Sequence, residues 1–230
     1  MLSASGIPKK GRSLDRQEIL VVGLGRFGRA LARTLLDQGH EVLGVDADAT
    51  TVQAASRELR HVIQADATDT AAMREIGAHE FKTGVVAIGS DLEASIIATY
   101  ILVDMGLPRV WAKAITASHG AILERVGAHR VVFPEREMGE RIAHSLIGRT
   151  IDYLELDSSF VLLETSVPEK VAGMTLAAAE IRSKYGLTVV SVKKGNGPFG
   201  YATAETVLDT GDVIVVAGEP RNAEKFASLD

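Results

Sequence analysis

The fold follows from the stretch EILVVGLGRFG at residues 18–28. Ile19–Val22 form an apolar, β-branched run typical of a buried strand, and glycines follow at the spacing G-x-G-x-x-G. Gly23 permits a tight turn, Gly25 leaves room for a phosphate beside the backbone, and Gly28 allows the next helix to pack closely on the strand. The stretch therefore predicts a strand, a turn and a helix arranged around a bound phosphate.

Short β-branched runs alternate with helical patterns as far as residue 134, as in a parallel sheet covered by helices. The expected strands are Ile19–Val22, Glu41–Val45, His61–Gln64, Gly84–Ile88, Arg109–Lys113 and Arg130–Phe133. Asp69 and Ser118 stand where helices are expected to begin, and both residue types can cap free amides. We therefore expect an α/β fold, with a Rossmann-like, doubly wound, parallel six-stranded sheet.

The pattern changes after Pro134. Met138, Ile142 and Leu146 form an apolar stripe, which predicts a crossover helix with a surface to cover. Further on, we expect a smaller α+β C-terminal lobe with strands at Tyr153–Leu156, Phe160–Val167, Thr188–Lys193 and Val213–Ala217, and a helix over Thr175–Tyr185. The expected domains are a disordered tail (1–17), a nucleotide-binding Rossmann domain with the crossover helix (18–149) and the C-terminal lobe (150–230).

Composition argues against several classes of protein. The 230 residues include no cysteine, so disulfides, thiolate nucleophiles and cysteine-ligated zinc are excluded. The net charge of −5 disfavours nucleic acid as a partner, because phosphate backbones require clustered basic surface. No window reaches the roughly 18 to 20 apolar residues of a membrane helix, and the first 18 residues lack the apolar core of a signal peptide. We expect a cytoplasmic protein without direct membrane insertion.

The choice of nucleotide depends on residues around the glycine motif. Asp46 ends the second expected strand, where a carboxylate can bond the adenosine ribose hydroxyls. It would repel a 2′-phosphate and so disfavours NADP, whereas NAD, AMP, ADP and ATP share the same ribose. Arg26 adds a permanent charge beside the phosphates and favours adenine mononucleotides, with a plain surface role as the alternative. Asp66 could reach adenine or cap the next helix, and both readings stay open.

Several further motifs extend along most of the chain. They are GLGRFG at 23–28, GHEV at 39–42, ADAT at 65–68, VAIG at 86–89, WAKA at 111–114, PEREMG at 134–139 and RSKYG at 182–186. Together they resemble the regulator-of-potassium-conductance (RCK/KTN) family, specifically the cytosolic regulatory subunits of Ktr and Trk potassium uptake systems.

The resemblance implies a dimer of Rossmann lobes, commonly built into an octameric ring beneath a potassium-translocating membrane subunit. ATP and ADP would compete for the pocket, with NAD or NADH as the other ligand that the glycine motif accepts. Arg26 would approach the terminal phosphate, Lys113 would lie near phosphate, and Asp66 and Ala67 would lie at the adenine. The full set of expected nucleotide-binding residues is Gly23, Gly25, Arg26, Phe27, Gly28, Asp46, Asp66, Ala67, Lys113 and Glu135.

Two further ligands enter through the resemblance. Glu135 would face the nucleotide of the neighbouring subunit and help to hold a divalent or monovalent cation; by its position alone it is a first-turn carboxylate favoured by the helix dipole. Some relatives bind cyclic di-AMP with an arginine that matches Arg182. This chain has Thr188 and Ala204 where those relatives have asparagine and proline, which disfavours cyclic di-AMP, and Arg182 has the alternative role of covering apolar surface.

An oxidoreductase is the main rival function, because hydride-transfer enzymes use the same glycine fingerprint. None of the four tyrosines has a lysine four residues later, and the six histidines show no ligand spacing. We therefore expect a regulatory protein rather than an enzyme. A regulatory module of a different ion transporter, such as a cation-efflux or chloride carrier, would share every one of these features.

Overall fold

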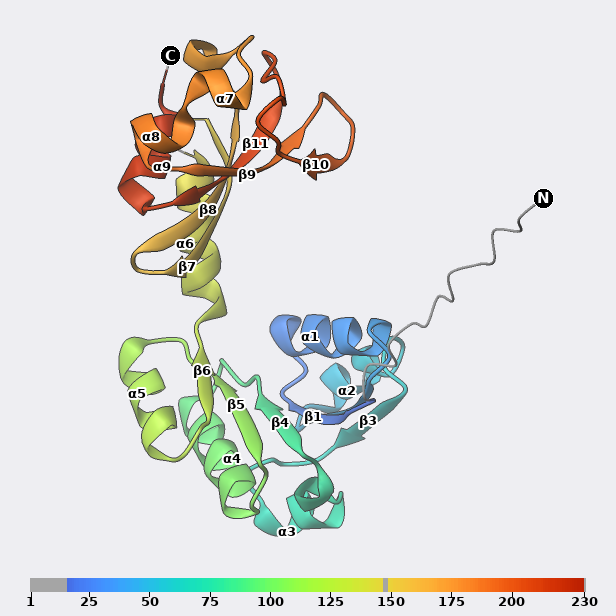
Figure 1. Ribbon diagram of the computed structural model, residues 1–230. Helices are drawn as coiled ribbons and strands as arrows, with labels where there is room; N and C mark the ends of the chain where they lie inside the picture. The colour runs from blue at the N-terminus through green and yellow to red at the C-terminus, as the bar shows by residue number, and fades with distance from the viewer. Residues whose placement is uncertain (1–15, 147–148, 230) are drawn as a thin grey trace, which may run out of the picture. The chain divides into compact units, whose positions relative to one another are not determined.

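The computed structural model describes residues 16–146 and 149–229 (Figure 1). The chain divides into two compact units between Pro134 and Glu135, and each unit has its own sheet. Most of the predicted tail over residues 1–17 lies outside the described residues. Arg16, where the description begins, forms an ion pair with Glu41.

The first unit is built on a six-stranded sheet in the order β3-β2-β1-β4-β5-β6, with every neighbouring pair parallel. Its strands are β1 Glu18–Val22, β2 Glu41–Asp46, β3 His61–Gln64, β4 Thr83–Val86, β5 Arg109–Lys113 and β6 Arg130–Val132. Its helices are α1 Arg26–Asp37, α2 Ala49–Ala55, α3 Thr70–Glu75, the 3-10 helix η1 Ala78–Glu80, α4 Leu92–Asp104 and α5 Ala117–Arg125. The expected doubly wound Rossmann-like sheet is confirmed.

Helices bury both faces of this sheet, as Figure 1 shows. Along β1, Leu20 and Val22 join the core that contains Leu102 of α4, whereas Ile19 and Val21 join the core on the opposite face with Ala32 of α1. Because helices cover both faces of the sheet, the residues of β1 are apolar without interruption and do not alternate between apolar and polar. This double burial explains why the sequence signal for β1 is so strong.

Two local predictions in the first unit differ from the structure by more than one residue at the end of an element. Strand β4 ends at Val86 and not at Ile88, because the backbone at Ile88 already passes beside the glycine turn: a Cβ on Gly23 would lie 2.9 Å from the Ile88 nitrogen. Ser118 is not the cap of α5. The chain is still extended at Thr116, whose hydroxyl accepts from the His119 N–H, so the helix starts before Ser118.

The capping role of Asp69 is confirmed. Its Oδ1 accepts a hydrogen bond from the Ala71 N–H at 2.8 Å, at the start of α3.

The second unit contains a five-stranded antiparallel sheet in the order β10-β9-β11-β8-β7. Its strands are β7 Thr150–Asp157, β8 Phe160–Ser166, β9 Thr188–Lys193, β10 Phe199–Tyr201 and β11 Val213–Gly218. Its helices are α6 Pro134–Leu146, the 3-10 helix η2 Glu169–Val171, α7 Leu176–Ala179, α8 Ile181–Tyr185 and α9 Pro220–Ala227. Strand residues such as Leu163 and Val216 pack with Phe226 of α9 in one core. The expected α+β lobe is confirmed.

The single helix predicted over Thr175–Tyr185 is wrong. Glu180 adopts a left-handed conformation, with φ 50° and ψ 38°, and divides the segment into α7 and α8. Residues two apart point to nearly opposite sides of a continuous helix, yet Ala179 and Ile181 are both buried in the same core. The break at Glu180 lets both side chains reach that core.

The crossover helix α6 is grouped with the second unit, whereas the sequence placed it in the first domain. None of its residues is buried. Side chains nevertheless link it to the second unit, since Arg141 pairs with Asp152 of β7 and His144 lies beside Glu224 of α9. A domain boundary near residue 149 stays a prediction.

Candidate nucleotide-binding site

The glycine turn joins β1 to α1 at the carboxyl edge of the parallel sheet. Strand β1 lies between β2 and β4, where the order of strands along the chain reverses, and ligands of such sheets bind outside this crevice. Gly23 has a φ of +91°, which L side chains rarely adopt, and its N–H donates to the Val45 carbonyl at 2.8 Å. The turn is thereby fixed against the end of β2.

The other two glycines of the motif have opposite surroundings. Gly25 is exposed, and a Cβ placed on it would meet no atom within 4 Å. Gly28 is buried, and a Cβ there would overlap the carbonyl oxygen of Gly23 and lie 3.3 Å from the Ala87 Cβ. Gly25 therefore leaves open space for a ligand at the helix start, while Gly28 brings α1 against the sheet.

The amino end of α1 fits a phosphate group. Helices α2 to α5 each begin with a side-chain oxygen that accepts from a free backbone N–H, supplied by Asp48, Asp69, Asp91 and Thr116 respectively. Helix α1 has Gly25 at its N-cap, so it has no side-chain cap, and its first turn contains no acidic residue. The free amides and the positive end of the helix dipole are thus directed at open space, where an anion is favoured.

Asp46 accepts two backbone hydrogen bonds that the sequence did not reveal. Its Oδ2 accepts from the Leu24 N–H at 2.7 Å and its Oδ1 from the Asp48 N–H at 2.9 Å. One carboxylate therefore holds the glycine turn and the chain after β2 together. Each oxygen keeps a further lone-pair direction, so the group can still accept from ribose hydroxyls. The position of Asp46 at a strand end next to the glycine motif was the only sequence signal for these two hydrogen bonds.

Asp66 and Ala67 follow β3 at the same edge of the sheet. Asp66 Oδ1 accepts from the Thr68 hydroxyl at 2.7 Å and the Thr68 N–H at 2.8 Å, and these two bonds lower the pKa of Asp66. The helix that follows is capped by Asp69, so the alternative that Asp66 caps it is wrong. Ala67 is buried in the core. Contact of Asp66 and Ala67 with adenine stays a prediction.

Lys113 ends β5 and reaches the glycine turn. Its side chain is buried, and its Nζ lies 5.7 Å from the centroid of the Phe27 ring, within cation–π range. A Cβ on Gly89, just after β4, would lie 2.9 Å from the same Nζ. Sequence reasoning missed Gly89 as part of this cluster, although the glycine that ends the VAIG motif was a possible signal. A cation and the uncapped helix end thus lie at one edge of the first unit.

The remaining candidates lie on exposed positions. Arg26 is the first residue of α1. Glu135 lies in the first turn of α6, and Arg182 lies in α8, both in the second unit. The contacts predicted for these three residues, with a terminal phosphate, a cation and a second nucleotide, stay predictions.

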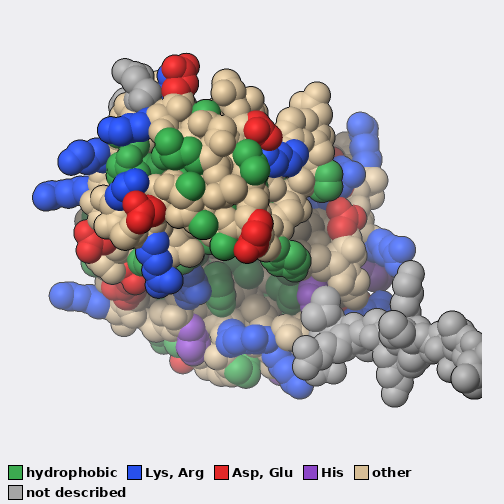
Figure 2. Space-filling view, turned by 45° about the horizontal axis from the view of Figure 1, so that its top comes forward, with side chains coloured by type: hydrophobic (Ala, Val, Ile, Leu, Met, Phe, Trp, Pro, Cys, Tyr) green, Lys and Arg blue, Asp and Glu red, His purple; other side chains and the backbone are tan. Residues whose placement is uncertain are grey.

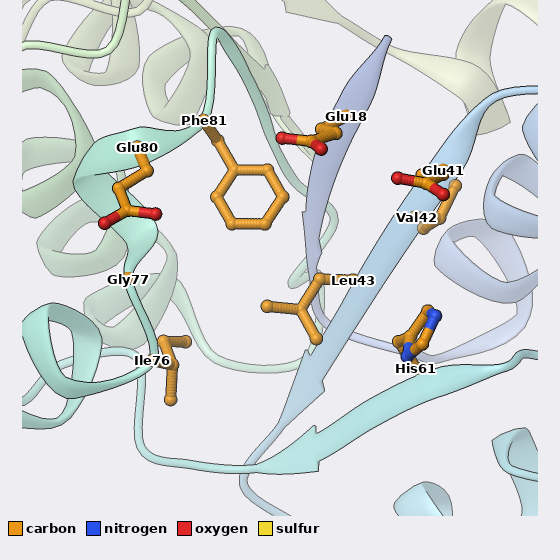
Figure 3. A pocket seen from close by; sticks show the side chains of 9 residues that line it. All are labelled: Glu18, Glu41, Val42, Leu43, His61, Ile76, Gly77, Glu80 and Phe81. Atoms are coloured by element: carbon orange, nitrogen blue, oxygen red, sulfur yellow. The ribbon is translucent and has the colours of Figure 1, made fainter. Parts of the chain in front are cut away.

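A hollow of about 320 Å³ lies at the opposite, amino-terminal edge of the sheet (Figure 3). It is lined by Glu18, Glu41, Val42, Leu43, His61, Ile76, Gly77, Glu80 and Phe81. Three carboxylates line its wall and disfavour a phosphate group there. Within residues 16–146 and 149–229, no group of three or more histidine, aspartate or glutamate side chains is arranged to hold a metal ion.

No helix within the described ranges is long and apolar enough to cross a membrane. The face seen in Figure 2 carries acidic and basic side chains interspersed with apolar ones. That face therefore does not present charge of a single sign.

Known proteins resemble this chain over nearly its full length. Residues 19–134 match the TrkA-N domain and residues 160–229 match the TrkA-C domain. The Ktr system potassium uptake protein C of Bacillus subtilis is 34% identical over 212 residues, which cover 92% of this chain and 96% of that protein. The Ktr system potassium uptake protein A of Vibrio alginolyticus is 32% identical over 215 residues, or 93% of this chain and 98% of that one.

Solved structures share the fold. The crystal structure of the GsuK RCK domain superposes with a TM-score of 0.66 at 20% identity, covering 97% of this chain and 49% of that chain. The GsuK channel bound to NAD gives a TM-score of 0.66 at 20% identity, covering 97% of this chain and 41% of that chain. The chain thus spans half or less of these solved chains, and at this identity the likeness is one of fold.

Proposed function

Since this chain, which contains TrkA-N and TrkA-C domains, belongs to the regulator-of-potassium-conductance family, we propose that it is a nucleotide-sensing regulatory subunit of a potassium uptake system. It acts in the cytoplasm and is held at the membrane by a potassium-translocating subunit of the Ktr or Trk type. The Ktr relatives, which it matches over more than nine-tenths of their length, support this assignment.

The observation that carries the proposal is the uncapped start of α1. At the start of each of the other four α-helices of the first unit, a side-chain oxygen accepts a hydrogen bond from a free backbone amide. Helix α1 has no such side chain, and in this proposal the ligand accepts from its free amides. The ribose is held by Asp46 and the adenine lies near Asp66 and Ala67. Lys113 contributes positive charge to the phosphates.

We assign ATP and ADP as the ligands that carry the signal. Arg26 begins α1 beside Gly25 and can form a charge-assisted hydrogen bond with a terminal phosphate, which ADP lacks at that position. NAD or NADH is the alternative, because it has the same ribose and pyrophosphate and because the GsuK channel of this fold is described bound to NAD. Cyclic di-AMP is not part of the proposal.

Gating requires that ATP and ADP stabilise different shapes, since a ligand with equal affinity for both shapes shifts nothing. The shapes would be those of a dimer, and of an octameric ring of dimers, docked on the membrane subunit. Exposed apolar side chains support self-association: Met138, Ile142 and Leu146 of α6 are 49%, 50% and 79% exposed. In such an assembly Glu135 of one subunit would add a cation to the phosphates of its neighbour.

The role is regulatory rather than catalytic. The Ktr relatives are named as potassium uptake proteins, which supports a regulatory role. Regulation of a different ion transporter is the second candidate, because the nucleotide site alone does not select the membrane partner.

Reconstitution tests the proposal. The protein is added to liposomes that contain the membrane subunit of its own uptake system, and potassium flux is recorded with ATP, ADP or NADH. Flux that rises with ATP and falls with ADP is the expected result. Nucleotide-independent flux would contradict the proposal, and a loss of absorbance at the nicotinamide band with added substrate would favour an oxidoreductase.

A further inference from the structure

Gly89 lies in the segment between β4 and α4, at the carboxyl edge of the parallel sheet. Its φ is outside the left-handed region, so the backbone there does not itself require glycine. A Cβ added at this position would lie 2.9 Å from Nζ and 3.3 Å from Cε of Lys113, and 3.6 Å from Cγ2 of Ile115. The two shorter distances are below the about 3.5–4.0 Å at which non-bonded carbon atoms pack. The missing side chain therefore makes room for the end of one lysine.

Lys113 extends from β5, the strand paired with β4, and is the one buried lysine or arginine within residues 16–146 and 149–229. Lysine is seldom buried, and its flexible four-carbon stem usually leaves the amine mobile in solvent. Here the Nζ also lies 5.7 Å from the centroid of the Phe27 ring, at the second position of α1. The amine is thus confined close to two segments of the chain, one that follows β1 and one that follows β4.

The place of this amine is as important as its charge. Strands β1 and β4 are neighbours in the sheet, and Phe27 follows the uncapped start of α1, where free amides favour an anion. A mobile lysine would lose side-chain entropy each time it was ordered on a ligand. An amine that is already confined beside the Phe27 ring avoids most of that loss. Its position should therefore increase the affinity for phosphate groups.

We propose that Gly89 is a positioning residue of the nucleotide site, and that the absence of a side chain at position 89 keeps the Lys113 amine beside Phe27. Gly89 acts through Lys113 and not by touching the ligand. The inference rests on the proposed function, because the phosphates of the nucleotide are the groups that the amine attracts. A methyl group at position 89 displaces the amine, since the end of a lysine side chain moves more readily than the backbone. The protein then keeps its fold and binds phosphates less tightly.

A double-mutant cycle, measured by isothermal titration calorimetry with ADP, separates this role from a structural one. Lys113→Met should lower the affinity about ten-fold, the loss expected for one charge-assisted hydrogen bond, and Gly89→Ala about three- to ten-fold. The double variant should bind no more weakly than Lys113→Met alone, because the amine that the methyl group would displace is already absent. Gly200→Ala is the matched control and should bind as wild type, since an added Cβ at this exposed glycine of β10 would lie 3.8 Å from the Val192 carbonyl oxygen.

Two further measurements do not depend on nucleotide. In a crystal structure of ligand-free Gly89→Ala, the Lys113 Nζ should lie more than about 6 Å from the centroid of the Phe27 ring, outside cation–π range. In urea unfolding, any stability that Gly89→Ala loses should be regained in the double variant, where the crowded amine is gone.

The outcomes distinguish this inference from the proposed function. An amine that stays beside Phe27 in Gly89→Ala, losses of ADP affinity that add in the double variant, or a double variant that does not fold would each overturn the role of Gly89 alone. A wild type that binds no nucleotide would contradict the proposed function and this inference together.

Discussion

The backbone of Gly28 lies so close to the carbonyl oxygen of Gly23 that a Cβ on Gly28 would overlap this oxygen. The first and last glycines of the motif are therefore in contact across the turn. This contact sets the distance between α1 and the end of β1, and with it the position of the free amides that point at the proposed phosphate.

Gly28→Ala should destabilise the protein, because the backbone of the turn must move to admit a methyl group. Overpacking of this kind costs about 1–3 kcal/mol, measured as the free energy of unfolding in urea. Gly25→Ala is the matched control: the site is open and its φ of −63° suits alanine, so stability should change by less than about 0.5 kcal/mol. Equal stability of the two variants would contradict this account.

Asp46→Ala should lower the affinity for ATP, ADP and NAD by similar factors. All three share the adenosine ribose, and the Leu24 N–H loses its acceptor in each case. A loss of about ten-fold corresponds to one charged hydrogen bond. Isothermal titration calorimetry checks it, with a stoichiometry of one nucleotide per chain in the wild type. Asp48→Ala, a carboxylate that only caps α2, should leave affinity unchanged. Unaltered nucleotide affinity in Asp46→Ala would contradict the proposal that Asp46 binds the ribose.

Arg26→Ala should separate the two adenine nucleotides. Most ADP affinity should remain, whereas ATP affinity should fall about ten-fold or more, since a charge-assisted hydrogen bond to the last phosphate contributes about 1.5–3 kcal/mol. ATP-stimulated potassium flux in liposomes should disappear with it. Arg33→Ala, at an exposed position further along α1, controls for loss of general positive charge. If flux still rises with ATP in Arg26→Ala, another group senses the terminal phosphate.

Lys194→Met should destabilise the second unit, because Lys194 Nζ bonds Asp212 Oδ2 at 2.6 Å and Asp212 is only 4% exposed. A buried carboxylate without its cation costs about 1–3 kcal/mol, measured by urea unfolding at neutral pH. Lys193→Met is the control, since the Lys193 Nζ only lies over the exposed Phe199 ring, at 5.8 Å from its centroid.

The same pair sets part of the acid sensitivity. Burial alone would raise the pKa of Asp212, but hydrogen bonds from Lys194, Asp209 N–H and Gly195 N–H outweigh it and lower the pKa. The stabilisation is therefore present above the unfolded pKa, about 3.9, and is lost as pH falls through the lower folded pKa. In Lys194→Met the acid loss of stability should begin at a higher pH. If the variant and the wild type lost stability over the same acidic pH range, the Lys194–Asp212 pair would not be coupled to folding.

Ile142→Glu should shift the protein toward a smaller assembly, because it places a charge in the apolar stripe of α6, where Ile142 is half exposed. Light scattering at micromolar concentration gives the molar mass. Ala143→Glu, on the next position of the same helix, should leave the assembly intact. A monomeric wild type would rule out the proposed dimer.

Sequence alone was most successful where local and global signals agree. The run Ile19–Val22 is apolar because helices cover both faces of the sheet. Of the glycines that follow, Gly23 and Gly28 lie where a side chain would meet the chain just after β4 or the turn itself. The break at Glu180 was not predictable, because no glycine or proline marks it and the cause is burial of two residues in a core assembled from distant strands. Strand β10 is exposed along its length and gives no alternation to detect.

The candidate site was predicted residue by residue but not as a set of contacts. Spacing placed Asp46 at a strand end, yet its bond to the Leu24 N–H depends on how the turn folds back over β2. The approach of Lys113 to Phe27 likewise joins residues from β5 and α1, which only the strand order brings together. Such contacts between residues far apart in the chain produce no periodic pattern in a single sequence.

The two units have separate apolar cores, and no residue of α6 is buried. Folding of such a chain does not have to be a single all-or-none event, so one melting temperature does not describe it. Nucleotide bound at the glycine turn should raise the transition of the first unit by mass action. The second unit would then unfold at its own temperature, and the gap between the two transitions would report the nucleotide concentration to which the protein is exposed.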